Sequence, residues 1–482
     1  MLRRTKIVAT LGPATSSDES LEDIIQAGVD VVRLNFSHGE SQDHIQRAKQ
    51  VRDIAARLGR YVAVLADLQG PKIRIARFEK DKITLKVGDS FALDTRLGVS
   101  EGNQQAVGID HEAVINDSHP GDVLLLDDGR IELLVKSNDG VRIECDVLIG
   151  GVLSNNKGIN KQGGGLSAKA LTDKDKADIK VAAELDADYV AVSFPRDADD
   201  MHEARELLKA AGSEAGLIAK IERAELVADH DMLDEVIRVS NGVMVARGDL
   251  AVEIGDAELV AIQKHIIQRA RTLNRVVITA TQMMESMITS PMPTRAEVSD
   301  VANAVIDGTD AVMLSAETAV GEYPKEVVEA MNRICMGAER SPTTQVSQHR
   351  IHEEFEQIDE SIALSAMYAA NHLQGVKAII SMTETGKTPL LMSRIRSGVP
   401  VFSFSAQQAT QRRVAMYRGV YTVPFVAADV DHDKVNRLAV DTLVKQGVVE
   451  KGDLVILTKG DYIKAQGGTN TMKILQVGGE IH

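Results

Sequence analysis

A series of short apolar segments, separated by helical patterns, constrains the fold of this chain more than any other feature. Such segments are typical of strands buried in a parallel sheet. The helix signals between them include an acidic start at Asp18 with Gly28 at the stop, and a capping box of Thr294 and Glu297. The eight apolar segments are residues 5–12, 31–37, 62–67, 189–194, 216–222, 242–249, 276–281 and 311–317.

Eight strand–helix units predict an α/β fold of the (β/α)8 type, in which functional groups gather at the carboxyl ends of the strands. A doubly wound parallel sheet is the structural alternative. No Gly-x-Gly-x-x-Gly motif follows the first segment to support a dinucleotide-binding version of that fold. The barrel is therefore the favoured architecture.

Charged residues close several of these apolar segments. Lys220 and Glu222 end one segment and Asp249 ends the next. Side chains alternate along a strand, so Lys220 and Glu222 point to the same side. Charges at the ends of buried strands are costly unless they bind something, and a divalent metal that holds an anionic substrate fits them. The alternative is a structural network in which Arg33 pairs with Glu222 or Glu317.

The alternation of strands and helices is interrupted once and changes once more near the end. Residues 70–171 carry short strands and turn signals, among them Asp128-Gly129, and predict an inserted all-β lid domain, a small β-barrel. Residues 1–69 and 172–341 then form the catalytic barrel. Residues 342–482 read as a carboxyl-terminal α/β regulatory domain.

The bulk properties exclude several classes of protein. The 482 residues carry a net charge of −15, which argues against nucleic acid as a partner. Cys145 and Cys335 lie in different segments and suggest neither a disulfide framework nor a zinc site. There is no signal peptide and no apolar span long enough for a membrane, so we expect a cytoplasmic protein.

A hydroxyl-rich loop follows an apolar segment in the last third of the chain. Gly386-Lys387-Thr388 is similar to the end of a phosphate-binding P-loop, but Ser381 occupies the place of its first glycine. The loop is therefore no Walker site. Two interpretations stay open: an anion site at the start of a helix, and an ordinary polar turn.

Seven segments, in order along nearly the whole chain, resemble the pyruvate kinase family, and its bacterial members in particular. The resemblance implies a barrel, an inserted lid, a regulatory carboxyl-terminal domain and a homotetramer. The segments are residues 32–39 (VRLNFSHG), 66–74 (ADLQGPKIR), 219–222 (AKIE), 244–250 (MVARGDL), 280–287 (ATQMMESM), 293–297 (PTRAE) and 313–318 (MLSAET).

The family reaction transfers the phosphoryl group of phosphoenolpyruvate to ADP, giving ATP and pyruvate, as the last step of glycolysis. By resemblance, Glu222 and Asp249 hold Mg²⁺ or Mn²⁺. Lys220 stabilises the charge on the transferring group, and Arg33 contacts the phosphates from the opposite side. Thr281 lies where the enolate of pyruvate is protonated, through water.

The resemblance also implies binding residues of three kinds. The substrate is bound by the residues above together with Ala246, Arg247, Gly248, Ser315 and Glu317. The nucleotide is bound by Asn35, His38, Arg74 and Lys157, although the position of His38 at the start of a loop, taken alone, favours a solvated side chain. An allosteric activator is bound by Thr383, Thr385, Gly386, Lys387 and Thr388.

The late segment Lys459–Lys464 has no arginine for a second phosphate, and its Asp461 would repel an anion. We therefore expect a sugar monophosphate or AMP as the activator rather than fructose 1,6-bisphosphate. A second departure from the family follows residue 160, where Lys161-Gln162 stands in place of Leu-Pro and predicts a looser lid hinge.

A third departure concerns monovalent cations. Potassium-dependent relatives bind the ion through positions that match Asn35, Ser37 and Asp67, with the carbonyl of Leu68, and carry a Glu where this chain has Lys72. A lysine ammonium could supply the positive charge of the ion and would repel it. We expect an enzyme that does not require K⁺.

Two other functions remain to be separated from this one. A metal-dependent aldolase or lyase acting on a pyruvate enolate would share Glu222 and Asp249 but would need neither Lys220 nor a lid. A non-catalytic sugar-phosphate sensor would use the loop at 383–388 and would have no need of Thr281. An assay for pyruvate from phosphoenolpyruvate and ADP separates all three.

Overall fold

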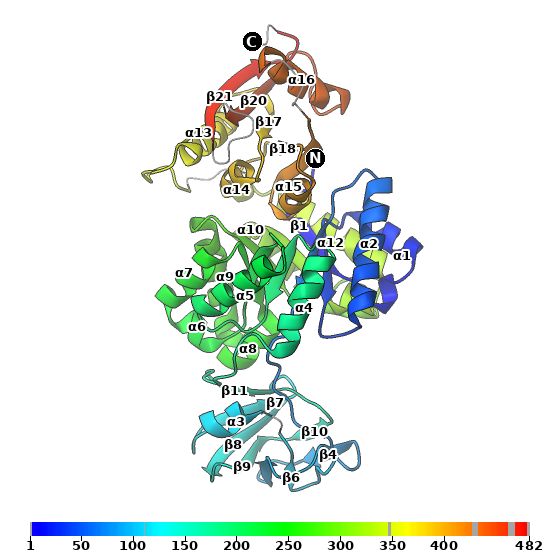
Figure 1. Cartoon of the computed structure of the whole chain (residues 1–482), viewed down its shortest axis with the longest axis vertical. Coiled ribbons are helices and arrows are strands. Elements are labelled where there is room, and N and C mark those ends of the chain that lie inside the picture. Colours follow the sequence, from blue (N-terminus) through cyan, green and yellow to red (C-terminus); the bar gives the residue numbers. More distant parts are fainter. Residues whose placement is uncertain (1, 110, 346–348, 427–431, 461–467, 480–482) are drawn as a thin grey trace.

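The computed structural model describes residues 2–109, 111–345, 349–426, 432–460 and 468–479. Three units follow one another along the long axis of the molecule, with the parallel barrel in the middle (Figure 1). In that view the inserted lid segment lies below the barrel and the carboxyl-terminal unit above it. None of the helices in these described ranges is long and apolar enough to cross a membrane.

The eight predicted strands form one closed parallel barrel in the order β1-β16-β15-β14-β13-β12-β3-β2, which confirms the fold class. Most strands end earlier than the apolar segments that predicted them, because their last polar residues belong to the following turns or helices. The strands are β1 (Lys6–Thr10), β2 (Val31–Asn35), β3 (Ala63–Asp67), β12 (Tyr189–Val192), β13 (Gly216–Ile221), β14 (Gly242–Ala246), β15 (Val276–Ala280) and β16 (Ala311–Leu314).

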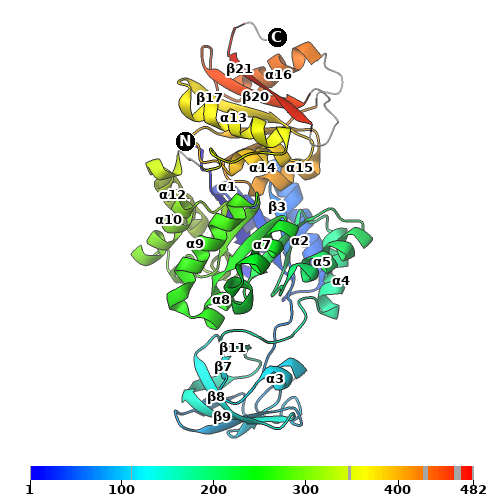
Figure 2. The same cartoon turned by 90° about the vertical axis from the view of Figure 1, so that its left-hand side faces the viewer.

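Helices surround the barrel and bury their apolar stripes against the outer faces of the strands (Figure 2). The expected caps are present: Gly28 follows the first helix, and Thr294 and Glu297 form a capping box. The helices of this layer are α1 (Asp18–Ala27), α2 (Ser41–Arg57), α4 (Asp173–Glu184), α5 (Ala198–Ala210), α6 (Ala224–Ala228), α7 (His230–Val239), α8 (Arg247–Ile254), α9 (Asp256–Thr272), α10 (Arg295–Asp307), α11 (Ala316–Ala319) and α12 (Pro324–Ala338).

The lid segment is built around antiparallel strands, as predicted, with one helix, α3 (Glu112–Asp117), among them. Its strands form a six-stranded sheet, β11-β7-β8-β9-β5-β6, and a two-stranded sheet, β10-β4, instead of the closed barrel that the sequence suggested. Asp128 and Gly129, both at positive φ, turn the hairpin between β7 and β8. The strands are β4 (Lys82–Leu85), β5 (Ser90–Asp94), β6 (Ala106–Val107), β7 (Val123–Leu126), β8 (Ile131–Asn138), β9 (Arg142–Ile149), β10 (Gly151–Ser154) and β11 (Ile159–Lys161).

The carboxyl-terminal unit is an α/β sheet in the order β19-β18-β17-β20-β21, parallel except for β21. Its apolar side chains join those of the barrel interior in one cluster, so this unit closes the amino-terminal end of the barrel. The site is therefore left to the opposite end, facing the lid. The elements are α13 (Ile358–His372), β17 (Val376–Met382), α14 (Lys387–Ser393), β18 (Val401–Ser405), α15 (Gln408–Arg413), β19 (Val420–Pro424), α16 (His432–Lys445), β20 (Leu454–Gly460) and β21 (Thr469–Gln476).

Candidate active site

Lys220 lies between two buried carboxylates, Asp67 at the end of β3 and Glu222 directly after β13, two barrel strands that are separated by β12. Its Nζ is 3.0 Å from Glu222 Oε1 and 3.4 Å from Asp67 Oδ1, and it donates a hydrogen bond of 2.8 Å to Ser193 Oγ. Asp67 and Glu222 are each 1% exposed. Strand alternation thus brings Lys220 and Glu222 to the same side, as the sequence predicted.

Arg33 joins this cluster from strand β2. Its Nε donates to Asp67 Oδ2 at 2.5 Å, and its Nη1 donates to Thr10 Oγ1 at 3.1 Å. The structural alternative had Arg33 paired with Glu222 or Glu317. Those partners are wrong, because the side chain is held by Asp67, two strands away from Glu222. Arg33 and Lys220 therefore share one carboxylate.

The backbone after strand β12 turns at Phe194, and this turn directs an N–H group at the same cluster. Phe194 has φ of +53°, an uncommon conformation for a residue with a side chain. Its N–H donates to Glu222 Oε2 at 2.8 Å, and the neighbouring Ser193 Oγ donates to the carbonyl of Leu68 at 2.7 Å. An outlier of this kind, held by its surroundings, is common at functional sites.

The electrostatics of the cluster follow from burial and close charges. Burial lowers the pKa of Lys220, but Asp67 and Glu222 outweigh it and raise that pKa above its usual value. Burial likewise raises the pKa of Asp67, yet Arg33 and Lys220 hold it below its usual value. For Glu222 burial wins over the attraction of Lys220 and raises the pKa to about 7.

Two carboxylate oxygens of the cluster lack a hydrogen bond, although both lie near the Lys220 ammonium. Glu222 Oε1 and Asp67 Oδ1 are buried and accept no hydrogen bond from the described residues. Repulsion from Asp249 contributes to the raised pKa of Glu222, so these two carboxylates lie near one another. Hard oxygen ligands in this state fit Mg²⁺ or Mn²⁺. Within the described ranges no group of three or more His, Cys, Asp or Glu could hold a metal, so substrate oxygens would complete the shell.

The sequence predicted Asp249 at the end of a strand. In the structure it lies in a helix instead. Strand β14 ends at Ala246, which is buried, and α8 begins at Arg247. Asp249 is therefore in the first turn of a helix, where N–H groups are free and a carboxylate is favoured.

Thr281 follows strand β15 in a strained conformation with φ of +68°, and the next residue, Gln282, has φ of +53°. Thr281 Oγ1 accepts a hydrogen bond of 2.8 Å from the N–H of Gly248. The side chain of Arg247 turns away from this point: Nη2 donates to the Thr281 carbonyl at 2.6 Å and Nη1 to Asp300 at 2.7 Å. Arg247 thus supports the Thr281 backbone from behind.

Glu317, predicted to bind substrate, organises two loops in this structure. Its Oε1 accepts from the N–H of Met284 at 3.1 Å and its Oε2 from the N–H of Ser315 at 2.6 Å. Burial raises the pKa of Glu317. Ser315 Oγ is buried beside it and has no hydrogen-bond partner among the described residues.

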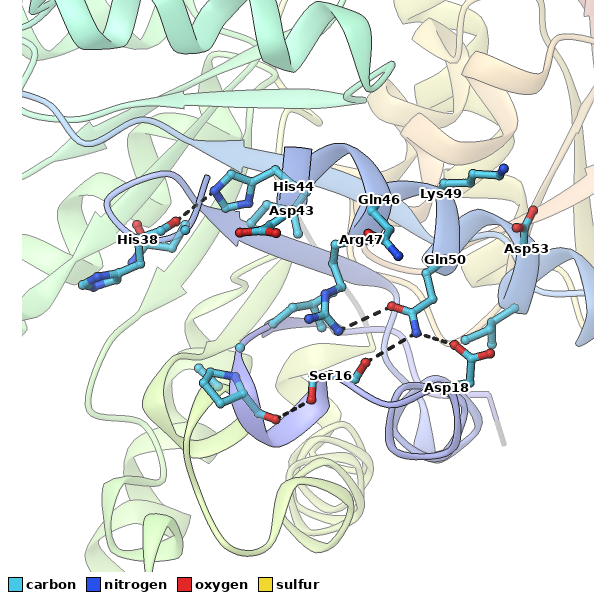
Figure 3. Close-up of a pocket in the computed structure, with 18 of the residues that line it drawn as sticks. Ser16, Asp18, His38, Asp43, His44, Gln46, Arg47, Lys49, Gln50 and Asp53 are labelled. Carbon is cyan, nitrogen blue, oxygen red and sulfur yellow. Dashed lines mark hydrogen bonds between the residues drawn. The ribbon is translucent and has the colours of Figure 1, made fainter. Parts of the chain in front are cut away.

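Asn35 and His38 line a large open cavity of about 1040 Å³ between α2 and the turn that follows β1. Asn35 Oδ1 accepts from the N–H of Ser37 at 3.1 Å, and the carbonyl of His38 contacts His44 Nε2 at 2.9 Å. Figure 3 shows His38 at one end of this cavity and Asp53 at the other. The space beside the predicted nucleotide residues is large enough for a nucleotide.

The other two predicted nucleotide residues, Arg74 and Lys157, belong to the two chain segments that connect the barrel with the lid sheets. Arg74 pairs with Gly158 in an isolated β-bridge and donates to the carbonyl of Asn156 at 3.2 Å. Lys157 forms an ion pair of 2.7 Å with Asp127. Neither side chain contacts Asn35 or His38, so the structure does not bring the four together.

No hydrogen bond or ion pair joins Lys72 to Asn35, Ser37 or Asp67 in the described part of the chain. The side chain of Lys72 is exposed and lines a small cavity of about 30 Å³ together with Phe194, Asp249 and Glu253. Among the residues that the structure describes, it has no ion-pair partner. Contact between Lys72 and Asp67 stays a prediction.

The loop predicted to bind the activator is closed by its own bonds. Thr383 Oγ1 accepts from the N–H of Gly386 at 2.9 Å, and Thr385 Oγ1 accepts from the N–H of Lys387 at 3.4 Å. Thr388 is buried, and its hydroxyl lies 2.7 Å from that of Thr469. Lys387 Nζ forms an ion pair of 2.7 Å with Asp359. The second half of the late segment, from Asp461, lies outside the described residues.

Sequence reasoning missed the residues that fasten the lid segment to the barrel. Asp175 is fully buried: its Oδ1 accepts from the N–H of Gly70, where the chain leaves the barrel, at 3.0 Å. Its Oδ2 accepts from the N–H of Thr172, where the chain returns, at 2.9 Å. An Asp three residues after a Thr N-cap is a capping-box signal that could have marked this helix start.

Two further residues that bond the lid segment to the barrel lie close in sequence to the proposed metal ligands. Arg223, which follows Glu222, donates to the carbonyls of Leu166 and Ala168 at 2.8 and 3.0 Å. Glu253, on the helix of Asp249, accepts from Asn160 Nδ2 at 3.3 Å.

The altered hinge residues are also bonded. Lys161 Nζ pairs with Asp122 at 2.8 Å, the N–H of Gln162 donates to the carbonyl of Val123 at 3.0 Å, and that of Gly163 donates to the carbonyl of Glu253 at 2.9 Å. A looser hinge stays a prediction.

Comparison with known proteins agrees with this site. A family model described as the barrel domain of pyruvate kinase matches residues 2–328, and one described as its alpha/beta domain matches residues 360–475. The chain is 59% identical over 476 residues to Pyruvate kinase II of Salmonella typhimurium, covering 99% of each. It is 57% identical over 471 residues to the pyruvate kinase of Haemophilus influenzae, covering 98% of this chain and 97% of the relative.

Among solved structures, the crystal structure of a pyruvate kinase from Cryptosporidium parvum matches with a TM-score of 0.91 at 33% identity. The match covers 98% of this chain and 96% of that chain. With both ends of the chain matched by family models and nearly its full length by relatives, the chain belongs to the pyruvate kinase family of phosphotransferases.

Proposed function

We propose that phosphoryl transfer between phosphoenolpyruvate and ADP takes place at the barrel mouth around Lys220. The observation that carries the proposal is the position of Lys220 Nζ, 3.0 Å from Glu222 and 3.4 Å from Asp67. An ammonium fixed there neutralises negative charge as the phosphoryl group leaves one oxygen for another. Arg33, held by the same Asp67, supplies the second positive charge.

Glu222 and Asp249 would hold Mg²⁺ or Mn²⁺, and the bound ion would supply Lewis-acid stabilisation of the carboxylate and enolate oxygens of the substrate. The chain's own contribution is to keep Glu222 oriented, because the N–H of Phe194 fixes one of its oxygens. The N–H of Arg247 in the first turn of α8 would receive the substrate carboxylate, joined by that of Gly248 when it leaves Thr281 Oγ1.

Thr281 would position the proton that the enolate takes up to become pyruvate. Its hydroxyl already accepts from Gly248, so a water between Thr281 and the enolate is suited to deliver the proton. On the nucleotide side, Asn35 and His38 at the large cavity would meet Arg74 and Lys157 when the lid segment approaches the barrel. Closure of a lid excludes water from such a transfer.

Four properties extend the proposal to regulation, assembly and location. The loop of Thr383, Thr385 and Lys387 would bind the phosphate of a monophosphate activator, which would compete with Asp359 for Lys387. Lys72 would make potassium dispensable. Assembly as a homotetramer and a cytoplasmic location are inferred from membership of the family.

The experiment is a coupled assay of the purified full chain for pyruvate formed from phosphoenolpyruvate and ADP with Mg²⁺. We expect turnover that requires both substrates. Pyruvate release from an aldol substrate without ADP would favour the lyase, and binding of sugar phosphates without turnover would favour the sensor; either result overturns the proposal.

A further inference from the structure

Four arginines converge on a cavity between the barrel and the carboxyl-terminal unit, on the side of the barrel opposite the active site. The cavity has a volume of about 20 Å³, and apolar residues such as Met367 and Met392 form much of the rest of its wall. The four arginines are Arg4, Arg271, Arg396 and Arg418.

Two of these arginines come from the barrel and two from the carboxyl-terminal unit. Arg4 precedes β1 and Arg271 lies in the last turn of α9. Arg396 follows α14 and Arg418 precedes β19. The cavity therefore lies where the two units meet, and whatever occupies it contacts both.

Among these four arginines, Arg418 is the one whose guanidinium has no ion-pair or hydrogen-bond partner in the described residues. It is 8% exposed, and its Nη2 is buried without a hydrogen-bond partner. Within the described part of the chain its side chain has neither an ion pair nor a hydrogen bond, and only its backbone N–H is engaged, with Asp310 at 3.1 Å. A buried guanidinium without a partner is costly, so it calls for an anion.

The nearby carboxylates are already occupied. Asp310 Oδ2 accepts from Arg394 Nη1 at 2.9 Å, and Glu339 accepts from the backbone N–H of Thr5 at 2.6 Å. Arg4 lies 3.6 Å from Glu339 and donates otherwise to carbonyls, including that of Ser397 at 2.6 Å, and to the hydroxyl of Thr344 at 3.2 Å. No carboxylate remains for Arg418.

Arg271 and Arg396 add like charge at the mouth of the cavity. A β-carbon placed on Gly308 would lie 3.0 Å from Arg271 Nη1 and 3.2 Å from Arg396 Nη2, so the two guanidiniums approach the same point. Burial first, and then neighbouring arginines, lower the pKa of Arg271 to about 9; for Arg418 burial, which outweighs Glu339, lowers it to about 10. Arginine stays protonated in proteins, so these directions reflect the cost of burying the charges and, second, of placing them together, both of which an anion would relieve.

We propose that this cavity binds a compact inorganic anion, which joins the barrel to the carboxyl-terminal unit through Arg418, Arg271 and Arg396. Its volume admits one water-sized group: a monatomic halide, or one oxygen of a phosphate whose remainder lies among the half-exposed Arg271 and Arg396 at the mouth. Guanidinium forks are the protein groups best suited to such anions.

The place of the site gives it a structural consequence. Helix α14 begins at Lys387, in the loop proposed for the activator, and Arg394 and Arg396 follow its other end. An anion bound to Arg396 and Arg418 therefore fixes the far end of this helix against the barrel. The proposal stands without the activator loop, because it rests on the cavity alone.

The first test compares the thermal unfolding of wild type, Arg418→Gln and the exposed control Arg437→Gln. Inorganic phosphate and chloride are each titrated at constant ionic strength, balanced with a bulky organic sulfonate. We expect phosphate or chloride to raise the Tm of wild type and of Arg437→Gln by roughly 2–4 °C more than that of Arg418→Gln. In the sulfonate alone, Arg418→Gln should be at least as stable as wild type, because it removes an unpaired buried charge.

Other anion sites are common to all three proteins, so the difference between them reports this cavity. Equal shifts for wild type and Arg418→Gln would overturn the proposal, and so would a large loss of stability of Arg418→Gln in the sulfonate. A direct measurement does not depend on the variant: wild-type crystals grown in bromide should show an anomalous peak beside Arg418. A cavity without that peak and without phosphate density in a phosphate soak would also overturn it.

Discussion

Lys220 and Glu222, two residues apart on strand β13, form a buried ion pair with 3.0 Å between Nζ and Oε1. The pair is shared, because Asp67 lies 3.4 Å from the same Nζ. Arg33 pairs with Asp67 as well, so two cations meet these two carboxylates. Burial and the nearby Asp249 still raise the pKa of Glu222, and a cation bound between Glu222 and Asp249 would relieve that cost.

Asp175 should control how firmly the lid segment is fastened. Asp175→Asn removes the charge that receives the N–H groups of Gly70 and Thr172, and we expect it to lower the free energy of unfolding by about 2 kcal/mol. The same change should raise KM for ADP more than KM for phosphoenolpyruvate, because the lid connections carry the nucleotide residues. Denaturant unfolding and steady-state kinetics measure both effects.

The control is Asp173→Asn, an exposed position in the same helical turn. It should change the free energy of unfolding by no more than about 0.5 kcal/mol. If Asp175→Asn has the same stability and the same two KM values as Asp173→Asn, Asp175 does not fasten the lid segment to the barrel.

Glu253 should make the lid connection sensitive to pH. Burial raises its pKa to about 7, above the unfolded value, so the folded state binds a proton that the unfolded state has released. The contribution of Glu253 to the free energy of unfolding is therefore complete at pH values below its unfolded pKa. It is lost as the pH rises to about 7. Glu253→Gln, which stays neutral, should gain roughly 2–3 kcal/mol relative to wild type between pH 5 and pH 8.

The measurement is the free energy of unfolding across that range, with the exposed Glu258→Gln as the matched control. If the difference in the free energy of unfolding between wild type and Glu253→Gln does not change with pH over this range, Glu253 is charged throughout it.

Lys72 should determine the cation requirement. Wild type should be fully active in a buffer whose only monovalent cation is tetramethylammonium, because the lysine supplies the positive charge near the phosphates. Lys72→Glu should lose activity there and regain about tenfold on addition of potassium chloride at constant ionic strength. Lys80→Glu, an exposed position in the same segment, should show no potassium effect. Strong potassium activation of wild type would refute this role.

The activator loop should prefer a monophosphate. Ribose 5-phosphate, glucose 6-phosphate and AMP should lower the phosphoenolpyruvate concentration at half-maximal rate, and at least one should act at lower concentration than fructose 1,6-bisphosphate. Thr385→Val should weaken that activator about tenfold by removing one hydroxyl. Thr442→Val, in the same unit but on α16, is the matched control. Tighter activation by the bisphosphate would overturn the assignment.

The barrel and the cluster around Lys220 could be predicted because both depend on local patterns. Apolar runs mark the strands, and period two places Lys220 and Glu222 on one side. The partner of Arg33 could not be predicted, since pairing between strands depends on barrel order and register. Asp249 was placed on a strand end because its helix begins directly after the apolar run. Arg223 and Glu253 carried no motif and Asp175 only that of a helix start, so only the path of the lid segment shows what they bind.

The central claim is that Lys220 acts on the phosphoryl group and not on the enolate. Lys220→Ala should lower pyruvate formation from phosphoenolpyruvate and ADP on the order of 10³-fold or more, while metal-dependent exchange of the methyl protons of pyruvate continues near the wild-type rate. Retained exchange also shows that the variant is folded, and Lys209→Ala, an exposed lysine, serves as the control. Near-normal phosphoryl transfer in Lys220→Ala, or loss of both half-reactions to the same degree, would contradict the account.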